Sequence, residues 1–337
     1  MRIKKEVRKI VASVLAFLMV VSLIPVNSLM TKANAASKTT FEGGKTVEDG
    51  TWKGWTWNVF GSSTDVTKAF ATDTGNGGVT LEVTGDKGKI NGSASDQGLN
   101  TFLYELDKSY DFTITAQAKV DTLAANAQAA FGLTIRDNVG AHGNTAKLTA
   151  DKNNFAFVGG YGNQAASGHG NAGYKTTALA HTRLGESPEV GGTYDLAIQK
   201  VGDSVKLYFN GEVAAECSAD DLITDNAMYV GLFAARNAKV TFNNVKLAYT
   251  QDSSSVKVTT NVTAPKKTTY CAGNTYEDVD LTGFKATVSV DGKEREITAS
   301  DCVVDMSNDP FAEVTDAGKL TLLYLGQTIE VPITVIK

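Results

Sequence analysis

The chain has 337 residues, with 32 Lys and Arg against 37 Asp and Glu, and a formal net charge of −5 at pH 7. The first 35 residues hold six basic residues and one acidic residue, so a chain without them has 26 basic against 36 acidic residues, a net charge near −10. This acidity argues against nucleic-acid binding and against attraction to anionic membrane lipids.

Residues 1–35 have the order of a secretory signal peptide. Five basic residues stand among the first nine, an apolar run extends from Ile10 to Ile24, and Ala33-Asn34-Ala35 supplies small residues for cleavage. The run is shorter than the ~20 residues that cross a bilayer, which favours cleavage over a membrane anchor. We therefore expect a secreted, extracellular protein with no membrane span, associated with the cell surface only through binding.

Residues 36–250 are predicted to form a first domain of antiparallel strands. Apolar residues recur at every second position, the pattern of half-buried strands, within residues 79–83, 110–120, 131–135, 155–157, 194–217, 228–235 and 240–249. Within 194–217, Gly202-Asp203 and Asn210-Gly211 mark two tight turns. The last run changes phase at Asn243-Asn244, which predicts a β-bulge.

A second, smaller domain is predicted over residues 258–337, after a short linker at 251–257 that is rich in Ser. Alternation over 284–290 and 329–335, with a turn at Asp291-Gly292, indicates several short strands. Helical patterns are nearly absent from both domains. The fold class is therefore all-β, an antiparallel jelly-roll sandwich followed by a smaller β-sandwich.

Two resemblances give these domains a family context. The segments 127–137, 194–217 and 229–235 resemble strands of concanavalin A-like lectin/glucanase (laminin-G-like) modules. Similar jelly rolls accompany secreted bacterial polysaccharide lyases and glycoside hydrolases, so the resemblance implies a polysaccharide partner. The segments 267–270, 281–284 and 331–335 resemble bacterial Ig-like domains, which implies a spacer or a module for a cell-wall or surface partner.

Known catalytic patterns of such jelly rolls are incomplete in this chain. A retaining glucanase strand needs two carboxylates that face one cleft, but Glu105-Leu106-Asp107 lacks the second Glu of that motif. The R-x-E-x-R strand of alginate lyases is absent, and no G-x-S-x-G accompanies the histidines, which are His142, His169 and His181. We expect no catalytic residues, while an enzyme with an unrecognised site stays an alternative.

Aromatic and arginine side chains are the candidates for sugar contacts. Arg136 falls on the strand face opposite Leu133 and Ile135, and Arg236 ends another strand; a guanidinium pair would suit a uronic-acid polymer. The tryptophans cluster at 52–57, where they serve either the core or a surface platform for a glycan. The candidate ligand-binding residues are Arg136, Asp137, Tyr161, Tyr174, Arg236, Asn237, Trp52 and Trp57.

No cofactor is expected to be required, although a structural calcium ion is one expectation. Jelly-roll modules of this type often hold calcium between the first and last strands, where Glu42 and Asn243 fall in sequence order. Cys271 and Cys302 either form a disulfide that staples the smaller domain or stay as two thiols, and Cys217 is expected to be buried.

The leading hypothesis is a secreted, non-catalytic protein that binds a plant or microbial polysaccharide, including one that contains uronic acids, through one sheet face of the jelly roll. The first alternative is a polysaccharide lyase or glycoside hydrolase whose active site departs from known patterns. The second is a cell-surface adhesin or structural protein.

Overall fold

The computed structural model describes residues 39–61, 64–90, 97–125, 128–146, 148, 154–161 and 188–337. The predicted signal peptide lies outside the described residues. From Thr39 onward the chain forms one compact unit. Within the described residues, no helix has the length and apolar character needed to cross a membrane.

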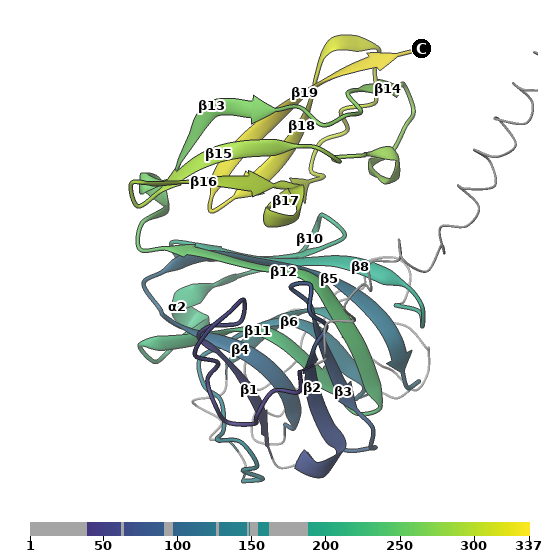
Figure 1. Cartoon of the computed structure of the whole chain (residues 1–337). Helices are drawn as coiled ribbons and strands as arrows, with labels where there is room; N and C mark the ends of the chain where they lie inside the picture. The colour runs from purple at the N-terminus through teal and green to yellow at the C-terminus, as the bar shows by residue number, and fades with distance from the viewer. Residues whose placement is uncertain are drawn as a thin grey trace, which may run out of the picture. The chain divides into compact units, whose positions relative to one another are not determined.

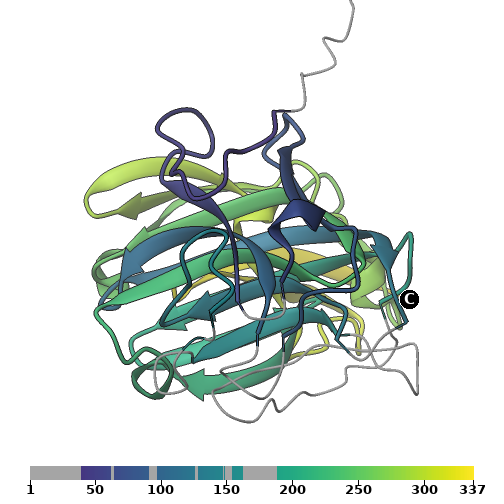
Figure 2. The same ribbon diagram turned by 90° about the horizontal axis from the view of Figure 1, so that it is seen from below.

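The larger sandwich consists of two antiparallel sheets that pack face to face (Figure 1). The five-stranded sheet has the order β1-β4-β11-β6-β7, and the seven-stranded sheet has the order β10-β9-β8-β5-β12-β3-β2. Figure 2 shows the same sandwich from below, turned by 90°. The strands are β1 (Trp55–Phe60), β2 (Ala69–Asp73), β3 (Val79–Val83), β4 (Leu99–Asp107), β5 (Asp111–Leu123), β6 (Ala130–Arg136), β7 (Phe155–Tyr161), β8 (Thr193–Val201), β9 (Ser204–Phe209), β10 (Glu212–Ser218), β11 (Ala227–Ala235) and β12 (Ala238–Thr250), with short helices η2 (Val66–Lys68) and α2 (Ala219–Leu222).

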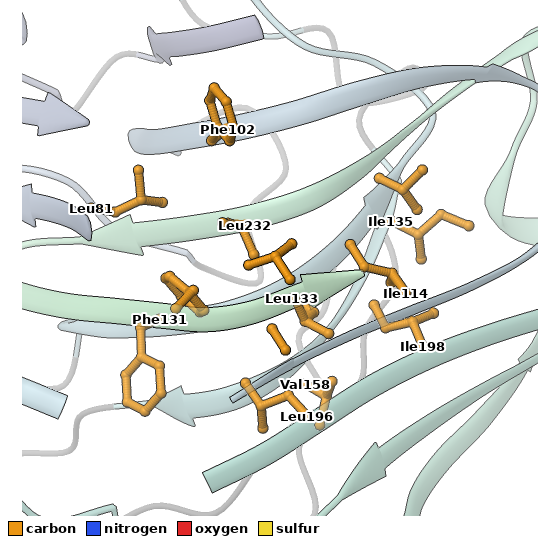
Figure 3. Packing of buried hydrophobic residues seen from close by; sticks show 14 of the residues in the cluster. Leu81, Phe102, Ile114, Phe131, Leu133, Ile135, Val158, Leu196, Ile198 and Leu232 are labelled. Atoms are coloured by element: carbon orange, nitrogen blue, oxygen red, sulfur yellow. The ribbon is translucent and has the colours of Figure 1, made fainter. Parts of the chain in front are cut away.

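The alternation of apolar residues explains the core between these sheets. Leu133 of β6 and Leu232 of β11 face Ile114 of β5 across the sandwich, and all three are fully buried. Figure 3 shows this packing around Leu81, Phe102, Ile114, Phe131, Leu133, Ile135, Val158, Leu196, Ile198 and Leu232. Burial of one apolar side chain of this size contributes roughly 1.5–3 kcal/mol, so the alternating residues supply most of the driving force. The all-β prediction is confirmed.

The β-bulge predicted near Asn243-Asn244 is also confirmed. The pairing of β12 with β5 shifts between Asn243 and Lys246, and Asn244 has a φ of 51°. The extra residue changes the phase of the strand, so that Phe242 before the bulge and Val245 after it both enter the core. Asn244 itself is exposed on the outer face of the seven-stranded sheet.

The predicted meander over 194–217 corresponds to β8, β9 and β10. Asn210 and Gly211 have φ angles of 49° and 81°, both positive as a type I′ turn requires. The sequence pattern was wrong at one point: a register shift between Val213 and Ala215 turns Ala214 inward and leaves Val213 50% exposed. Edge strands such as β10 often carry bulges, which hinder pairing with a further strand.

The smaller sandwich has a three-stranded sheet, β13-β15-β16, and a four-stranded sheet, β14-β19-β18-β17, in which β14 pairs with β19 in parallel. Its own core includes Phe284, Phe311, Leu320 and Val331. The strands are β13 (Lys257–Thr263), β14 (Thr269–Cys271), β15 (Lys285–Val290), β16 (Lys293–Thr298), β17 (Val303–Asp305), β18 (Thr315–Tyr324) and β19 (Gln327–Ile336), with short helices η4 (Ser253–Ser255), η5 (Tyr276–Asp278) and η6 (Ala299–Asp301).

Residues 251–257, predicted as a linker, contain η4 and the start of β13. The side chain of Asp252 caps η4 by accepting a hydrogen bond from the backbone N of Ser254 at 2.8 Å. Val256 is buried in the core of the smaller sandwich. On the preceding strand, Thr250 Oγ1 donates to Asp291 Oδ1 at 2.6 Å.

The disulfide considered between Cys271 and Cys302 is not formed. Cys271 ends β14 and Cys302 precedes β17, and these strands are the two opposite edges of the four-stranded sheet. Three strand spacings of about 4.8 Å separate such edges by roughly 14 Å, beyond the ~7 Å limit for the Cα atoms of a disulfide. Burial instead raises the pKa of the Cys302 thiol to about 12.

Gly132 and Gly159 face each other across β6 and β7, where the strands leave no room for a side chain. A Cβ atom on Gly132 would collide with the carbonyl group of Val158. We expect Gly132→Ala to lower the free energy of unfolding by about 1–3 kcal/mol in urea titrations, because the sheet must open to accept the methyl group. Gly85→Ala, where a Cβ makes only ordinary contacts, is the control and should change it by less than about 0.5 kcal/mol. Equal stability losses in the two variants would contradict this explanation.

Candidate functional site

The structure buries the arginine that was predicted to face a ligand. Arg136 ends β6 with 0% exposure, and its guanidinium carbon lies 5.1 Å from the ring centre of Phe155 and 5.6 Å from that of Phe60. Its Nη2 donates to Gln97 Oε1 at 2.9 Å, and its Nε donates to the carbonyl of Asn138 at 3.3 Å. Burial lowers the pKa of Arg136 to about 10. The expectation of an open sheet face at Arg136 is therefore wrong.

A second apolar cluster covers this outer face of the five-stranded sheet. It combines outward-facing side chains of β1, β4, β6, β7 and β11 with Ile90, while Val139 and Leu148 pack against it. Its strand residues are Phe60, Leu99, Ala130, Phe155, Phe157, Phe233 and Ala235. The sequence held a signal for this: the run Phe155-Ala-Phe-Val158 is apolar at every position, as in strands buried on both faces.

Arg236 lies far from Arg136. Tyr229 of β11 pairs with Arg136, whereas Ala235 pairs with Ala130 at the other end of β6. Six residues of strand at about 3.3 Å each place Arg236 roughly 20 Å from Arg136. Arg236 Nε donates to the carbonyl of Gly88 at 3.1 Å. The predicted guanidinium pair is therefore not formed.

Asp137, the neighbour of Arg136, holds two loops together. Its Oδ1 accepts from the backbone N of Asn154 at 2.8 Å, and its Oδ2 accepts from Asn154 Nδ2 at 2.9 Å and Thr224 Oγ1 at 3.0 Å. Burial raises the pKa of the Asp137 carboxyl above its ordinary value, while these donors and Arg136 act in the opposite direction. With 1% exposure, Asp137 is a structural group and not a surface ligand contact.

The tryptophans belong to the core. Trp52, Trp55 and Trp57 are 4%, 5% and 9% exposed and join the cluster between the sheets. Trp57 Nε1 donates to Asn100 Oδ1 at 2.7 Å, which satisfies the buried indole. The core interpretation is confirmed, and a surface platform at Trp52 and Trp57 is excluded. His142 is also structural: its Nδ1 accepts from the backbone N of Val59 at 3.2 Å.

The remaining sequence candidates divide into two groups. Asn237 is partly exposed and lines a shallow hollow of about 390 Å³ at the ends of β3 and β5. Tyr161 ends β7, but its side chain lies outside the described residues, as do Tyr174, His169 and His181. The ligand-binding roles of Asn237, Tyr161 and Tyr174 therefore remain predictions.

Two carboxylates considered for calcium and for catalysis, Glu42 and Asp107, have other partners. Glu42 Oε1 pairs with Lys45 Nζ at 2.6 Å on the surface, and Asn243 lies opposite Gln117 on β5. Asp107 Oδ1 accepts from both the backbone N and the Oγ of Ser109, and these bonds lower the pKa of Asp107. Among the described residues, no group of three or more His, Cys, Asp and Glu is arranged to hold a metal ion.

A larger cleft, which the sequence did not indicate, lies where the smaller sandwich meets the outer face of the seven-stranded sheet. Its volume is about 760 Å³, within the usual range of ligand pockets. Side chains of both sandwiches line it, and the polar and aromatic ones include Gln117, Asp195, Asn210, Asn244, Tyr276 and Glu277. We call this space the inter-sandwich cleft.

The pairing register of neighbouring strands places polar residues side by side on the sheet wall of the inter-sandwich cleft. Gln117 of β5 is the partner of Asp195 on β8, and Gln117 Nε2 donates to Asp195 Oδ1 at 3.2 Å. The turn residue Asn210 accepts from the backbone N of Asp195 through Oδ1 at 2.9 Å. The bulge in β12 adds Asn244 to the same wall. Bulges commonly redirect side chains in this way next to binding sites.

The opposite wall is fixed by short-range contacts in the smaller sandwich. A capping box between Thr275 and Asp278 forms η5, which carries Tyr276 and Glu277. The hydroxyl of Tyr276 donates to the carbonyl of Asn308 at 2.9 Å. This anchor and its packing against Phe311 hold the Tyr276 ring in place, whereas Glu277 is exposed.

Direct contacts hold the two walls together. Thr115 Oγ1 donates to the carbonyl of Ser300 at 2.8 Å, and Lys246 Nζ lies 3.8 Å from Asp301 Oδ1. Tyr208 and Val303 pack in a small buried cluster with Ala197 at the floor. Burial, with Asp305 and Glu216 nearby, raises the pKa of Tyr208 to about 12. The result is a preformed space in which amides and carboxylates stand beside aromatic and aliphatic side chains such as Phe209, Leu281 and Met306. Such a mixture suits a ligand that presents both hydroxyl groups and apolar C–H faces.

Comparison with known proteins gives one similar sequence and several distant folds. No family model matches the chain. The chain is 30% identical over 253 residues to pectate lyase L of Thermoclostridium stercorarium, an alignment that covers 74% of this chain and 19% of the lyase. The chain thus spans about a fifth of the length of that relative.

Two solved structures illustrate the distant likenesses in fold. A carbohydrate binding module from Bacillus subtilis is 17% identical, with a TM-score of 0.34, 64% of this chain covered and 96% of the module. Lectin II from Ulex europaeus is 9% identical, with a TM-score of 0.38, 63% of this chain covered and 98% of the lectin.

The burial of Arg136 predicts that its side chain stabilises the fold. We expect Arg136→Ala to lower the free energy of unfolding by roughly 2–5 kcal/mol, since the change empties a space between two rings and removes a hydrogen bond to Gln97 Oε1. The exposed Arg295→Ala is the control, with an expected change below about 0.5 kcal/mol. Urea unfolding monitored by tryptophan fluorescence measures both. An Arg136→Ala protein as stable as the control would show that the guanidinium is not part of the core.

Proposed function

We propose that the protein is a secreted, non-catalytic binding protein for a plant or microbial polysaccharide, and that the inter-sandwich cleft holds the glycan. The observation that carries this proposal is the cleft itself, in which amides and carboxylates stand beside a fixed tyrosine ring. Sugars present hydroxyl groups to such polar side chains and apolar C–H faces to aromatic rings.

The sequence match supports a polysaccharide as the ligand. The relative's name is that of an enzyme acting on pectate, and the aligned part is 19% of its length. An alignment of that extent leaves most of the longer protein for the chemistry, so the aligned part can bind polysaccharide without cleaving it. Fold likeness alone would not justify this step.

The same match also favours the alternative that the chain is itself a polysaccharide lyase. What supports binding without cleavage is the commitment of Asp107 to a turn, the burial of Arg136, and the location of both outside the cleft. Incubation of the purified protein with polygalacturonate, alginate and xylan tests this. We expect no unsaturated ends by ultraviolet absorbance and no new reducing ends, whereas either product in proportion to protein concentration would establish an enzyme.

Asn244 offers a clean test of the cleft. Its positive φ suits glycine, so Asn244→Gly removes the amide with little backbone cost. We expect the affinity for a bound polysaccharide to fall roughly three- to tenfold, the effect of one hydrogen bond, by affinity electrophoresis or calorimetry.

Asn237→Gly is the competing variant, since Asn237 also has a positive φ and is the sequence-predicted ligand contact at the smaller hollow, which a glycan in the inter-sandwich cleft does not touch. Its affinity should equal that of the unmodified protein. Loss of binding in Asn237→Gly, with Asn244→Gly unaffected, would move the site away from the inter-sandwich cleft.

Secretion is part of the proposal and has its own test. We expect expression in a Gram-positive host to release protein whose mass corresponds to a chain beginning at Ala36, after the Ala33-Asn34-Ala35 site. Protein retained in the cell fraction with residues 1–35 attached would contradict cleavage.

A further inference from the structure

The inter-sandwich cleft has a marked charge of one sign. Three carboxylates line it, Asp195 and Glu212 from the larger sandwich and Glu277 from the smaller one, and the described lining includes no Lys, Arg or His. Asp195 and Glu277 are exposed, so both can meet a ligand.

The lysines near this surface are already engaged with acids. Lys246 lies 3.8 Å from Asp301, and Lys206 lies 3.9 Å from Glu216. Neither lysine lines the cleft. The carboxylates of the lining are therefore not paired with a cation within the lining itself, so the described lining carries a negative formal charge.

The negative charge of the lining favours an uncharged glycan over a polyuronate. A polyuronate carries a carboxylate on each sugar and would place like charges next to Asp195 and Glu277, an arrangement that interfaces avoid. An uncharged sugar instead donates its hydroxyl hydrogens to those carboxylates, and hydrogen bonds to ionised acceptors are about twice as strong as neutral ones.

The polar groups that face the cleft are matched to such hydroxyls. Gln117 Nε2 donates to Asp195 Oδ1, and Asn210 Oδ1 accepts from the backbone N of Asp195. Gln117 Oε1 and Asn210 Nδ2 are therefore the amide atoms left for a ligand. The ring of Tyr276 provides an apolar surface, because its hydroxyl is turned to Asn308. A volume of about 760 Å³ suits a short oligosaccharide segment.

We propose that the inter-sandwich cleft binds a short, uncharged segment of a polysaccharide, with Asp195 and Glu277 as acceptors for sugar hydroxyls, and that it discriminates against polyuronate chains. This rests on the proposed function and narrows it. The specificity then comes from the outer face of the seven-stranded sheet and the smaller sandwich together.

Binding of the full protein to separate polymers tests this proposal. The neutral probes are galactan, arabinan and xylan, and the acidic probe is polygalacturonate, each measured by affinity electrophoresis and calorimetry. We expect at least one neutral polymer to bind, with an affinity that changes little with NaCl, and at least about tenfold more tightly than polygalacturonate. Binding to polygalacturonate as tight as to the best neutral polymer would overturn the inference but leave the proposed function intact. No binding to any probe would remove both.

Calcium is a necessary arm of the experiment, since a divalent ion can bridge a polyuronate to carboxylates. Polygalacturonate binding is measured with CaCl2 and with EDTA. The inference predicts weak binding in both. Calcium-dependent binding that is lost in Asp195→Asn would overturn it, because those carboxylates would then serve as ion ligands for an acidic chain.

Charge reversal provides the matched variants. We expect Asp195→Lys with Glu277→Lys to lower the affinity for the neutral polymer at least about tenfold and to raise that for polygalacturonate. Glu294→Lys with Glu296→Lys changes the net charge equally at exposed positions of β16 outside the cleft, and should leave both affinities unchanged. Unaltered preference in the cleft variant, with folding verified by its thermal transition, would overturn the assignment of the site.

Discussion

Burial of the five-stranded sheet on both faces is the constraint on which the rest of this structure depends. Its inner face packs against the seven-stranded sheet, and its outer face is covered by the cluster around Phe155, Phe157 and Phe233. Arg136 lies in that covered layer. Within the described part of the larger sandwich, the outer face of the seven-stranded sheet is thus the less covered sheet face, and the smaller sandwich contacts it.

The second sandwich then has a structural role in the proposed site. Thr115, Lys246 and Tyr208 contact it from the sheet, and these contacts set the width of the inter-sandwich cleft. Since 10 of the 23 lining residues lie beyond residue 270, the proposed binding requires both sandwiches in the arrangement seen here. A site shared in this way gains preorganisation from each fold, which reduces the ordering cost when a flexible glycan binds.

The sequence predicted the strands better than the site. Alternation and turn residues were sufficient for the meander, the β12 bulge and the burial of Leu133, because each depends on local chain geometry. The face exposed at Arg136 was mispredicted, since coverage of a sheet depends on distant segments such as that carrying Ile90. The pairing of Gln117 with Asp195 could not be predicted from the sequence either, because it depends on the register between β5 and β8.

Hydrogen–deuterium exchange with and without the best-bound neutral polysaccharide shows which surface of the protein holds the glycan. If the glycan lies in the inter-sandwich cleft, backbone amides exchange more slowly in segments 193–197 and 275–279, the two walls of the cleft, with no change in 130–136. Protection confined to β6 and β7, with both cleft walls unaffected, would contradict this placement of the glycan.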